Sequence, residues 1–519
     1  MYPTSIRERD VLNVLSKNPE TNTQRELDFE ETTLEQVTEL SEAASKAARD
    51  YASRPLAWRS ELLRTMASEL DADAAKLVAV AHEETALSIA RLENELRRTS
   101  FQLRFFADVV LEGSFLRASI DHPKDSSMGP LPDLRRICTP LGPVGVFGSS
   151  NFPFAFSVPG GDTASALAAG CPVLIKAHPA HPATSQASIQ ALERAARLLK
   201  APEGLLGLIF GFHAGEALVD APAITAVGFT GSVSAGRALW RRASARRTPI
   251  PFYGELGAAN PLIVTNTAAA ERAQEIGRGI AESVTLGVGQ FCTKPGLVFV
   301  PLNEDGDALM TALSETLKQL PEMTMLTSEI ADRFRAGTLA LASLEGSRAL
   351  VVGEYRDDAH VQAALFEVAF DVFFQTSGSV VRDECFGPAV TIVRYRDVKE
   401  LQRALEYTDG ALTVSVFHGE NDDDAAWLLK FASLKAGRVI ANQYPTGVGV
   451  SWSMQHGGPW PSTTVSSATS VGASAIERWL RPVTFQNVAD SLLPDTLRDA
   501  NPLRISRRVD GVMQLNRSE

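Results

Sequence analysis

The strongest constraint on the fold is a regular alternation of short apolar segments with helical ones, which begins near residue 139. GPVGVFG, CPVLIKAHP, LLGLIFGF and ITAVGFTGS each stay apolar for a few residues and contain or end in glycine or proline. Most are followed by a stretch with helical periodicity, such as SQASIQALERAARLLK. This alternation is typical of βαβ units, whose strands lie parallel and are buried on both faces of one sheet. The sequence therefore predicts an α/β fold with a doubly wound sheet.

Other segments extend this picture in both directions. Residues 31 to about 110 are rich in Ala, Leu, Arg and Glu and predict a set of packed helices, the first beginning just after Thr33. A second α/β region is expected from Pro251, with PFYGELGAANPLIVTN, GLVFVPLN, PAVTIVRYR and LTVSVFHG as strands. Two further β-type segments lie outside the alternation and, although far apart in the chain, could pair as an arm.

We therefore expect a discontinuous first domain, a second domain, a small β arm and a C-terminal extension. Their ranges are 1–119 with 139–250, 251–463, 120–138 with 464–488, and 489–519, respectively.

Composition and charge exclude several classes of function. The 519 residues carry 50 Lys+Arg against 62 Asp+Glu, a net charge of −12, which disfavours nucleic acid or an anionic membrane as partner. No apolar run reaches the roughly 18 residues of a membrane span, and the first residues lack the apolar core of an export signal. The four cysteines lack the paired spacing of a zinc site. We expect a cytoplasmic protein with reduced thiols and no metal.

Cys292 and Glu255 are the first candidates for chemistry. Cys292 lies in GVGQFCTKPG, among glycines that allow close approach of a ligand, in surroundings of the sort that can favour a thiolate. A lone cysteine is also often a small buried hydrophobe. Glu255, in FYGELGAANP, is either a solvated turn carboxylate or a confined one whose raised pKa would make it a base near neutrality.

Three further positions lie where a strand ends. Asn151 follows an apolar strand, where ligands bind in open α/β sheets, although it also suits a turn before Pro153. Lys176 ends the strand PVLIK and could meet a ribose or phosphate, or face solvent. GSVSAG, from Gly231 to Gly236, opens a helix whose N–H groups could face a phosphate, but it lacks the three-glycine dinucleotide fingerprint.

Taken together and in this order, these segments resemble the aldehyde dehydrogenase superfamily. The matching stretches are GPVGVFGSSNFPF, PVLIKAHPA, VGFTGSVSAG, ELGAANP, GQFCTKPG and DECFGPAV. The resemblance covers nearly the whole chain except about 30 residues at each end. It implies an oxidoreductase with a Rossmann-like cofactor domain, a catalytic domain and an arm that joins subunits into a homodimer or a dimer of dimers.

The resemblance also implies roles for individual residues. Cys292 would attack the aldehyde and carry a thioester, Asn151 and the Cys292 N–H would hold the oxyanion, and Glu255 would activate the hydrolytic water. For the cofactor, the resemblance implies Lys176 at the adenosine ribose, Gly231 and Ser232 at the pyrophosphate, Glu384 at the nicotinamide ribose and Phe386 against the ring. His178 and Gly236 are further candidates for cofactor binding.

One departure from the family bears on cofactor choice. NAD-preferring relatives often carry a glutamate three residues after the lysine, where this chain has Pro179. No carboxylate at that position opposes a 2′-phosphate, and His178 could assist it, so NADP is favoured over NAD. Ala258 stands where ELGG is commoner, a change that should leave activity intact.

The substrate is the least determined part. VLIKAHPAHPATS, MQHGGPWPSTT and TSVGASAIERWLRPVTFQN resemble the branch that contains 2,5-dioxopentanoate (α-ketoglutaric semialdehyde) dehydrogenases, and also NADP-dependent fatty aldehyde dehydrogenases. Oxidation of 2,5-dioxopentanoate to 2-oxoglutarate is the favoured reaction. A broad aliphatic specificity is the closest rival, because the expected pocket residues are apolar: Phe154, Phe156, Phe291 and Trp452.

A CoA-acylating dehydrogenase and a non-catalytic assembly subunit fit the residues less well. The first is opposed by Glu255, which provides a hydrolytic route. The second is opposed by the intact Cys292, Glu255, Asn151 and Lys176, since a dead relative would have lost one of them.

Overall fold

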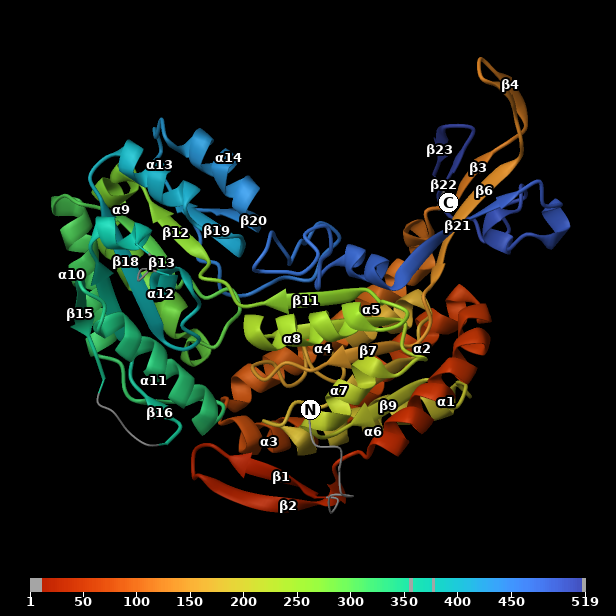
Figure 1. Cartoon of the computed structure of the whole chain (residues 1–519), viewed down its shortest axis with the longest axis horizontal. Coiled ribbons are helices and arrows are strands. Elements are labelled where there is room, and N and C mark those ends of the chain that lie inside the picture. The colour runs from red at the N-terminus through yellow and green to blue at the C-terminus, as the bar shows by residue number, and fades with distance from the viewer. Residues whose placement is uncertain (1–11, 354–357, 376–378, 516–519) are drawn as a thin grey trace, which may run out of the picture.

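The computed structural model describes residues 12–353, 358–375 and 379–515. Two α/β lobes lie side by side, and a β arm projects from the first lobe (Figure 1). The helices predicted near the N-terminus are present as α1 (Leu34–Ser53), α2 (Leu56–Ala72), α3 (Ala74–Thr85) and α4 (Ile89–Glu112). Thr33 begins α1 with a capping box, since its hydroxyl accepts from the Gln36 N–H and the Gln36 side chain accepts from the Thr33 N–H.

The first lobe contains a five-stranded parallel sheet in the order β11-β10-β7-β8-β9. The order reverses between β7 and β10, which confirms the doubly wound pattern and creates a switch point for ligands. Its strands are β7 (Val144–Phe147), β8 (Val173–Lys176), β9 (Leu206–Ile209), β10 (Ala226–Gly231) and β11 (Phe252–Leu256). The connecting helices are α5 (Gly161–Ala169), α6 (Pro182–Leu198), α7 (Phe212–Asp220) and α8 (Val233–Ala245).

The change from one sheet to the other comes after β11. This strand pairs in parallel with β10, and α8 is the crossover helix that connects the two strands. The first sheet therefore runs to Leu256, beyond the domain boundary expected at residue 250. The backbone then turns through Asn260, whose φ is +48°, before β12 (Pro261–Val264) starts the second sheet.

The second lobe contains a seven-stranded sheet in the order β15-β17-β18-β13-β12-β19-β20, in which only the edge strand β15 is antiparallel. Its other strands are β13 (Leu297–Pro301), β15 (Ser347–Val351), β17 (Ala364–Val368), β18 (Ala389–Tyr395), β19 (Ala411–Phe417) and β20 (Ala436–Ala441). Its helices are α9 (Asn266–Thr285), α10 (Glu304–Lys318), α11 (Ser328–Ala342), α12 (Ser379–Arg382), α13 (Val398–Glu406) and α14 (Ala425–Lys435).

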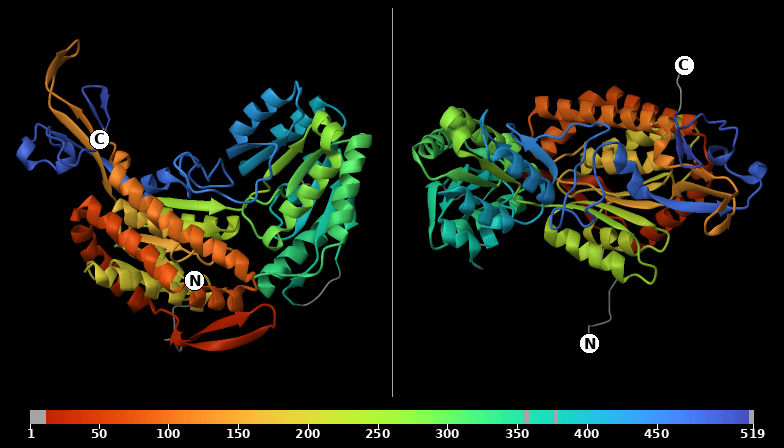
Figure 2. Two further views of the ribbon diagram at one scale, coloured as in Figure 1. Left: turned by 180° about the vertical axis from the view of Figure 1, so that it is seen from behind. Right: turned by 90° about the horizontal axis from the view of Figure 1, so that it is seen from above.

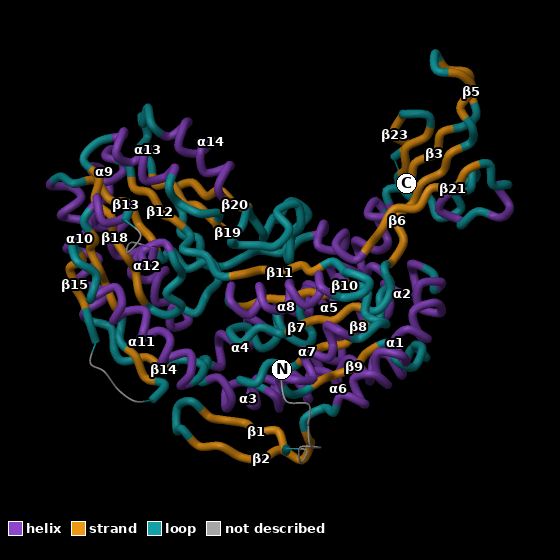
Figure 3. The backbone as a smooth tube through the Cα atoms, viewed as in Figure 1, coloured by secondary structure: helices purple, strands orange, loops and turns teal. Residues whose placement is uncertain are grey.

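The arm joins segments that are far apart in the chain, although residues 464–479 of the expected range pack against the first lobe instead. β21 (Leu480–Gln486) pairs antiparallel with β6 (Leu134–Pro140), which also pairs with β3 (Ser119–Asp121). Two strands from the C-terminal extension, β22 (Arg507–Val509) and β23 (Val512–Gln514), join the same sheet, and a hairpin of β4 (Lys124–Ser126) and β5 (Gly129–Leu131) forms its tip. Figure 2 shows the arm standing away from both lobes, and Figure 3 shows its strand content.

Two segments outside the two main sheets contribute to the contact between the lobes. Beyond β20 the chain returns to the first lobe, where the fully buried Trp479 donates its indole N–H to Ser165 at 2.8 Å. At the N-terminus, β1 (Asn13–Asn18) and β2 (Thr23–Glu30) form a hairpin that the sequence does not predict. Its Lys17 reaches across to Glu329 of the second lobe at 3.2 Å.

Among the helices of the described residues, none has both the length and the apolar character needed to cross a bilayer.

Candidate active site

Cys292 lies in a tight turn that follows α9. The preceding residues Gly287, Val288 and Gly289 all have positive φ. Glycine adopts this conformation without steric cost, and two of the three residues are glycines. A side chain at Gly289 would also collide with the Gly387 carbonyl. The Asn260 amide donates to the carbonyl oxygen of Cys292 at 2.7 Å and so fixes the turn from the other side. The nucleophile candidate is thus held by backbone geometry.

Glu255, the other principal candidate, lies near the end of β11 and is buried next to Cys292. The two side chains meet through His456, which the sequence reasoning missed: its Nε2 is 3.4 Å from Cys292 Sγ and 3.0 Å from Glu255 Oε1. The three reactive atoms lie within 4.8 Å of one another. The Ser470 hydroxyl donates to the second carboxylate oxygen of Glu255. An isolated histidine in the glycine-rich stretch MQHGGPW was the available sequence signal.

The returning segment delivers His456 and Ser470 as one unit. The Ser470 N–H donates to the carbonyl oxygen of His456 at 2.9 Å, and the His456 N–H donates to the Thr469 hydroxyl at 2.8 Å. The segment is also tied to β11, since the Leu256 N–H donates to the Ser462 carbonyl at 2.8 Å. His456 therefore sits on a part of the chain that packs directly against the strand carrying Glu255.

The pKa values of Cys292 and Glu255 are shifted in the directions opposite to those expected from the sequence. Burial, with the charges of Glu255 and Glu384, holds the pKa of Cys292 well above its usual range, so the predicted tendency toward thiolate was wrong for the resting site. The predicted rise for Glu255 was also wrong. Burial pushes its pKa up, but His456, Ser470 and Cys292 outweigh burial and the pKa is lowered. The resting site thus pairs an ionised Glu255 with a protonated thiol.

Asn151 contacts the turn that carries Cys292 and lines the same cavity. The residue is only 7% exposed, and its Nδ2 donates to the carbonyl oxygen of Gln290 at 2.8 Å. The Arg91 guanidinium donates to the Asn151 carbonyl at 2.8 Å, which fixes the backbone from which the amide projects. An amide nitrogen carries two hydrogens, so one remains for an oxyanion formed near Cys292.

A cavity of about 1120 Å³ opens at the carboxyl ends of the first sheet and reaches Asn151, Glu255 and Cys292. It lies at the switch point between β7 and β10, the expected place for a ligand. Among the residues assigned to a cofactor, six line this cavity: Lys176, His178, Gly231, Ser232, Glu384 and Phe386. Gly236 does not line it. A side chain there would clash with Leu256 and crowd Phe229, so this glycine serves helix–strand packing.

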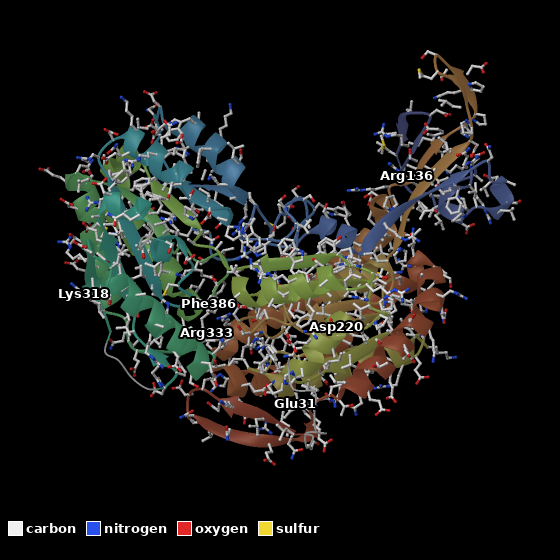
Figure 4. The ribbon with its side chains drawn as sticks, viewed as in Figure 1. Glu31, Arg136, Asp220, Lys318, Arg333 and Phe386 are labelled. Carbon is white, nitrogen blue, oxygen red and sulfur yellow. The ribbon has the colours of Figure 1, made fainter. Side chains whose placement is uncertain are left out.

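Both ends of the cavity carry ionisable groups. Burial lowers the pKa of Lys176 to about 8, against the opposing charge of Glu31. Burial raises the pKa of Glu384 to about 7, against the charge of Lys294. His178 has a pKa well below its usual range because of burial and the positive charges of Lys176 and Arg333 nearby, so it is a neutral ring. Figure 4 places Arg333 and Phe386 on the second lobe where it faces the first, and Glu31 by the N-terminal hairpin.

The four predicted pocket residues separate into two pairs. Phe156 lies near the thiol, with its ring centroid 6.2 Å from that of His456, and the Phe291 ring is 5.1 Å from that of Phe152. Phe154 instead has a fully buried side chain in the core of the first lobe. Trp452 is 50% exposed and packs against Phe105 with a ring separation of 5.6 Å. Phe156 and Phe291 are the pair near the reacting groups.

Comparison with known proteins shows extensive similarity. A model of the aldehyde dehydrogenase family matches residues 8–482. Alpha-ketoglutaric semialdehyde dehydrogenase 2 of Azospirillum brasilense is 47% identical over 480 residues, covering 91% of each chain. The alpha-ketoglutaric semialdehyde dehydrogenase of Acinetobacter baylyi is 40% identical over 492 residues, covering 94% of this chain and 93% of the relative. The structure of aldehyde dehydrogenase 21 from Physcomitrella patens superposes with a TM-score of 0.78 at 19% identity, covering 94% and 96% of the two chains.

Proposed function

The chain belongs to the aldehyde dehydrogenase family, and from this premise we propose that it oxidises 2,5-dioxopentanoate to 2-oxoglutarate with NAD(P) as hydride acceptor. The observation that carries the proposal is the convergence of Cys292, His456 and Glu255 at one end of a cavity large enough for a dinucleotide. The substrate rests on two relatives, 47% and 40% identical, that are named for this semialdehyde.

The first half of the reaction forms a covalent bond to Cys292. His456 Nε2, 3.4 Å from Sγ, takes the thiol proton, and the ionised Glu255 at 3.0 Å stabilises the imidazolium that results. The thiolate then attacks the aldehyde carbon. Asn151 Nδ2 and the Cys292 N–H donate to the oxygen that becomes negative. The raised pKa of the resting thiol makes such a base necessary.

The cavity residues fit a nicotinamide dinucleotide. Ser232 caps α8 by accepting from the Ala235 N–H at 3.3 Å, so the positive end of this helix faces the cavity and suits a pyrophosphate. Lys176 would hold the adenosine ribose, and Glu384 and Phe386 would hold the nicotinamide half. NAD(P), when bound, accepts the hydride that leaves the carbon attached to Cys292.

The second half of the reaction releases the acid. Glu255 is ionised and close enough to Cys292 to be bridged to it by one water molecule. It takes a proton from that water as the oxygen attacks the thioester carbon and the C–S bond breaks. Overall, aldehyde, water and NAD(P)⁺ give carboxylate, NAD(P)H and protons.

We propose NADP as the preferred cofactor. Pro179 leaves no carboxylate three residues after Lys176, and Arg333 lies close enough to His178 for its charge to lower the pKa of that ring. The positive charge of Arg333 attracts a 2′-phosphate, and the uncharged Pro179 does not repel it. Glu31 near Lys176 opposes this charge, so the preference for NADP should be moderate.

We propose further that the arm joins subunits into a homodimer or a dimer of dimers in the cytoplasm. The support is the projection of the sheet that contains β3, β6 and β21 away from both lobes (Figure 2). Light scattering should give twice or four times the mass of one chain, and deletion of the hairpin tip at residues 124–131 should reduce it.

The substrate proposal is tested by a panel of aldehydes with each cofactor. The panel contains 2,5-dioxopentanoate, succinic semialdehyde, glutaraldehyde and long-chain aldehydes. We expect the highest kcat/KM for 2,5-dioxopentanoate. A higher value for long-chain aldehydes would establish a broad aliphatic specificity, which Phe156 and Phe291 near the thiol would suit.

A further inference from the structure

Arg98 on α4 has a guanidinium group with unused hydrogen-bonding capacity. Its Nε donates to the carbonyl oxygen of Val448 at 3.3 Å. Its two terminal nitrogens are buried and have no hydrogen-bond partner among the described residues. Burying charged donors without an acceptor is costly, so such a group in a folded enzyme points to an anionic ligand.

The guanidinium lies beside the reacting groups. It stacks over the Phe156 ring at 5.2 Å, and that ring is 6.2 Å from the imidazole of His456. Burial lowers the pKa of Arg98, and the negative charges of Glu95, of Cys292 when it is ionised, and of Glu255 act against this lowering. The positive charge of Arg98 is therefore within electrostatic range of both Cys292 and Glu255.

Other charged groups near Arg98 are partly engaged, although Glu95 Oε2 and Arg91 Nη1 also lack a hydrogen-bond partner among the described residues. One carboxylate oxygen of Glu95 accepts from the N–H groups of Phe154 and Ala155 at 2.8 and 3.0 Å. Arg91, earlier on α4, stacks on Phe152 at 5.2 Å and donates to the backbone of Asn151. Arg91 thus supports the oxyanion site, whereas Arg98 keeps both ends of its fork available.

Arg438 on β20 makes the contrast sharper. It also acts electrostatically on Cys292, but its terminal nitrogens donate to the carbonyls of Pro445 and Gly447. Arg98 holds the neighbouring Val448 from the opposite lobe. Two arginines thus hold the loop of residues 445–448. Of the two, Arg98 is the one whose terminal nitrogens have no hydrogen-bond partner among the described residues.

We propose that Arg98 binds the carboxylate of the substrate, at the end opposite the aldehyde that Cys292 attacks. This inference rests on the proposed function and names the group that would select 2,5-dioxopentanoate over a neutral aldehyde of equal length. A planar guanidinium presents two parallel N–H groups that match a carboxylate, and such charge-assisted pairs are stronger than neutral hydrogen bonds. The stack on Phe156 would keep the fork oriented.

The test compares Arg98→Met with Arg97→Met. Methionine keeps an apolar stem of similar length but removes the charge and the donors. Arg97 is the adjacent, exposed arginine on α4 and is the matched control. We expect Arg98→Met to lower kcat/KM for 2,5-dioxopentanoate at least 100-fold, mainly through KM, which corresponds to about 2.8 kcal/mol at 1.4 kcal/mol per tenfold. Its kcat/KM for pentanal should stay within threefold of wild type, and Arg97→Met should change neither.

The two hypotheses fail in different ways. Wild-type enzyme without preference for 2,5-dioxopentanoate over pentanal would overturn the proposed function. A preference that persists in Arg98→Met, or an equal loss on both substrates, would overturn the role of Arg98. If Arg98→Met does not fold, Arg98→Lys keeps the charge without the fork. It should lower kcat/KM for the acid aldehyde about tenfold and spare pentanal, and unchanged values would overturn the proposal.

Discussion

Glu255 and His456 should act as one unit when the thioester forms, and a double-mutant cycle can measure this. The variants are Glu255→Gln, His456→Gln and the combination. Glutamine at 255 keeps an oxygen that can accept from the Ser470 hydroxyl but carries no charge. If Glu255 assists acylation by stabilising the His456 imidazolium, its removal should matter only while His456 is present.

The size of the coupling follows from the separation of the two groups. Two unit charges 3.0 Å apart at an effective dielectric constant of about 20 attract by about 5.5 kcal/mol, an upper limit for a partly formed imidazolium. A neutral acceptor oxygen restores about 1.5–3 kcal/mol as a hydrogen bond to a charged group. The coupling should therefore be about 2.5–4 kcal/mol, or roughly 70- to 900-fold in rate.

The assay is rapid mixing of enzyme with saturating aldehyde and cofactor, followed by the absorbance of reduced nicotinamide in the first turnover. The double variant should acylate no more slowly than His456→Gln alone. Ser470→Ala is the control, because it removes a hydrogen bond from Glu255 without removing charge. In His456→Gln the acidic limb of the kcat profile should also move to higher pH. Burial, which raises the pKa of Glu255, is then no longer opposed by His456.

Additive effects of the two substitutions, with a coupling below about 0.5 kcal/mol, would refute this reasoning. Glu255 would then either affect acylation independently of His456 or, if Glu255→Gln leaves acylation unchanged, act only in hydrolysis of the thioester. In that case Glu255→Gln alone should give a burst of reduced cofactor at the wild-type rate, followed by turnover slower by about 10²–10⁴-fold.

Three further predictions concern single positions. Cys292→Ala should bind cofactor, measured by fluorescence titration, yet form no reduced cofactor with any aldehyde; activity above about a hundredth of wild type (~3 kcal/mol) would contradict covalent catalysis. Pro179→Glu should shift the ratio of kcat/KM values toward NAD by about tenfold (~1.4 kcal/mol), and an unchanged ratio would place selectivity elsewhere. Gly289→Ala should lower the free energy of unfolding in urea by about 1–3 kcal/mol, because its φ is +65° and a side chain would meet Gly387. Gly449→Ala, at an open position, is the control and should leave stability within about 0.5 kcal/mol of wild type.

The parts of the fold that could be predicted are those written in local pattern. Apolar runs closed by glycine or proline indicated the five strands of the first sheet and β12, β13, β18 and β19 of the second, but not β15, β17 and β20. A strand buried on both faces needs an unbroken apolar run. The hairpin at residues 13–30 escaped prediction because TQRELDFE is mostly polar and exposed on one strand. The C-terminal strand β22 escaped because RRV is short and owes its place to pairing with β3.

The site divides in the same way. Cys292, Glu255 and Asn151 stand in glycine-rich motifs and could be predicted, whereas His456 and Arg98 could not. His456 lies on an irregular segment, and Arg98 has the spacing of an ordinary charged face on a helix. The pKa directions of Cys292 and Glu255 were mispredicted for the same reason, since each is determined by neighbours from distant parts of the chain.

The reacting groups come from three separate parts of the molecule, and this explains why the return of the chain after β20 matters. Glu255 belongs to the first sheet, Cys292 to the second lobe, and His456 to the segment that crosses back between them. That segment is anchored by Trp479, and the next residue begins β21 of the arm. The same returning segment therefore carries His456 first and the start of the arm strand after it. His456 thus meets Cys292 of the second lobe and Glu255 of the first sheet only where the returning segment packs against both, whereas Cys292 and Glu255 are each held by their own lobe.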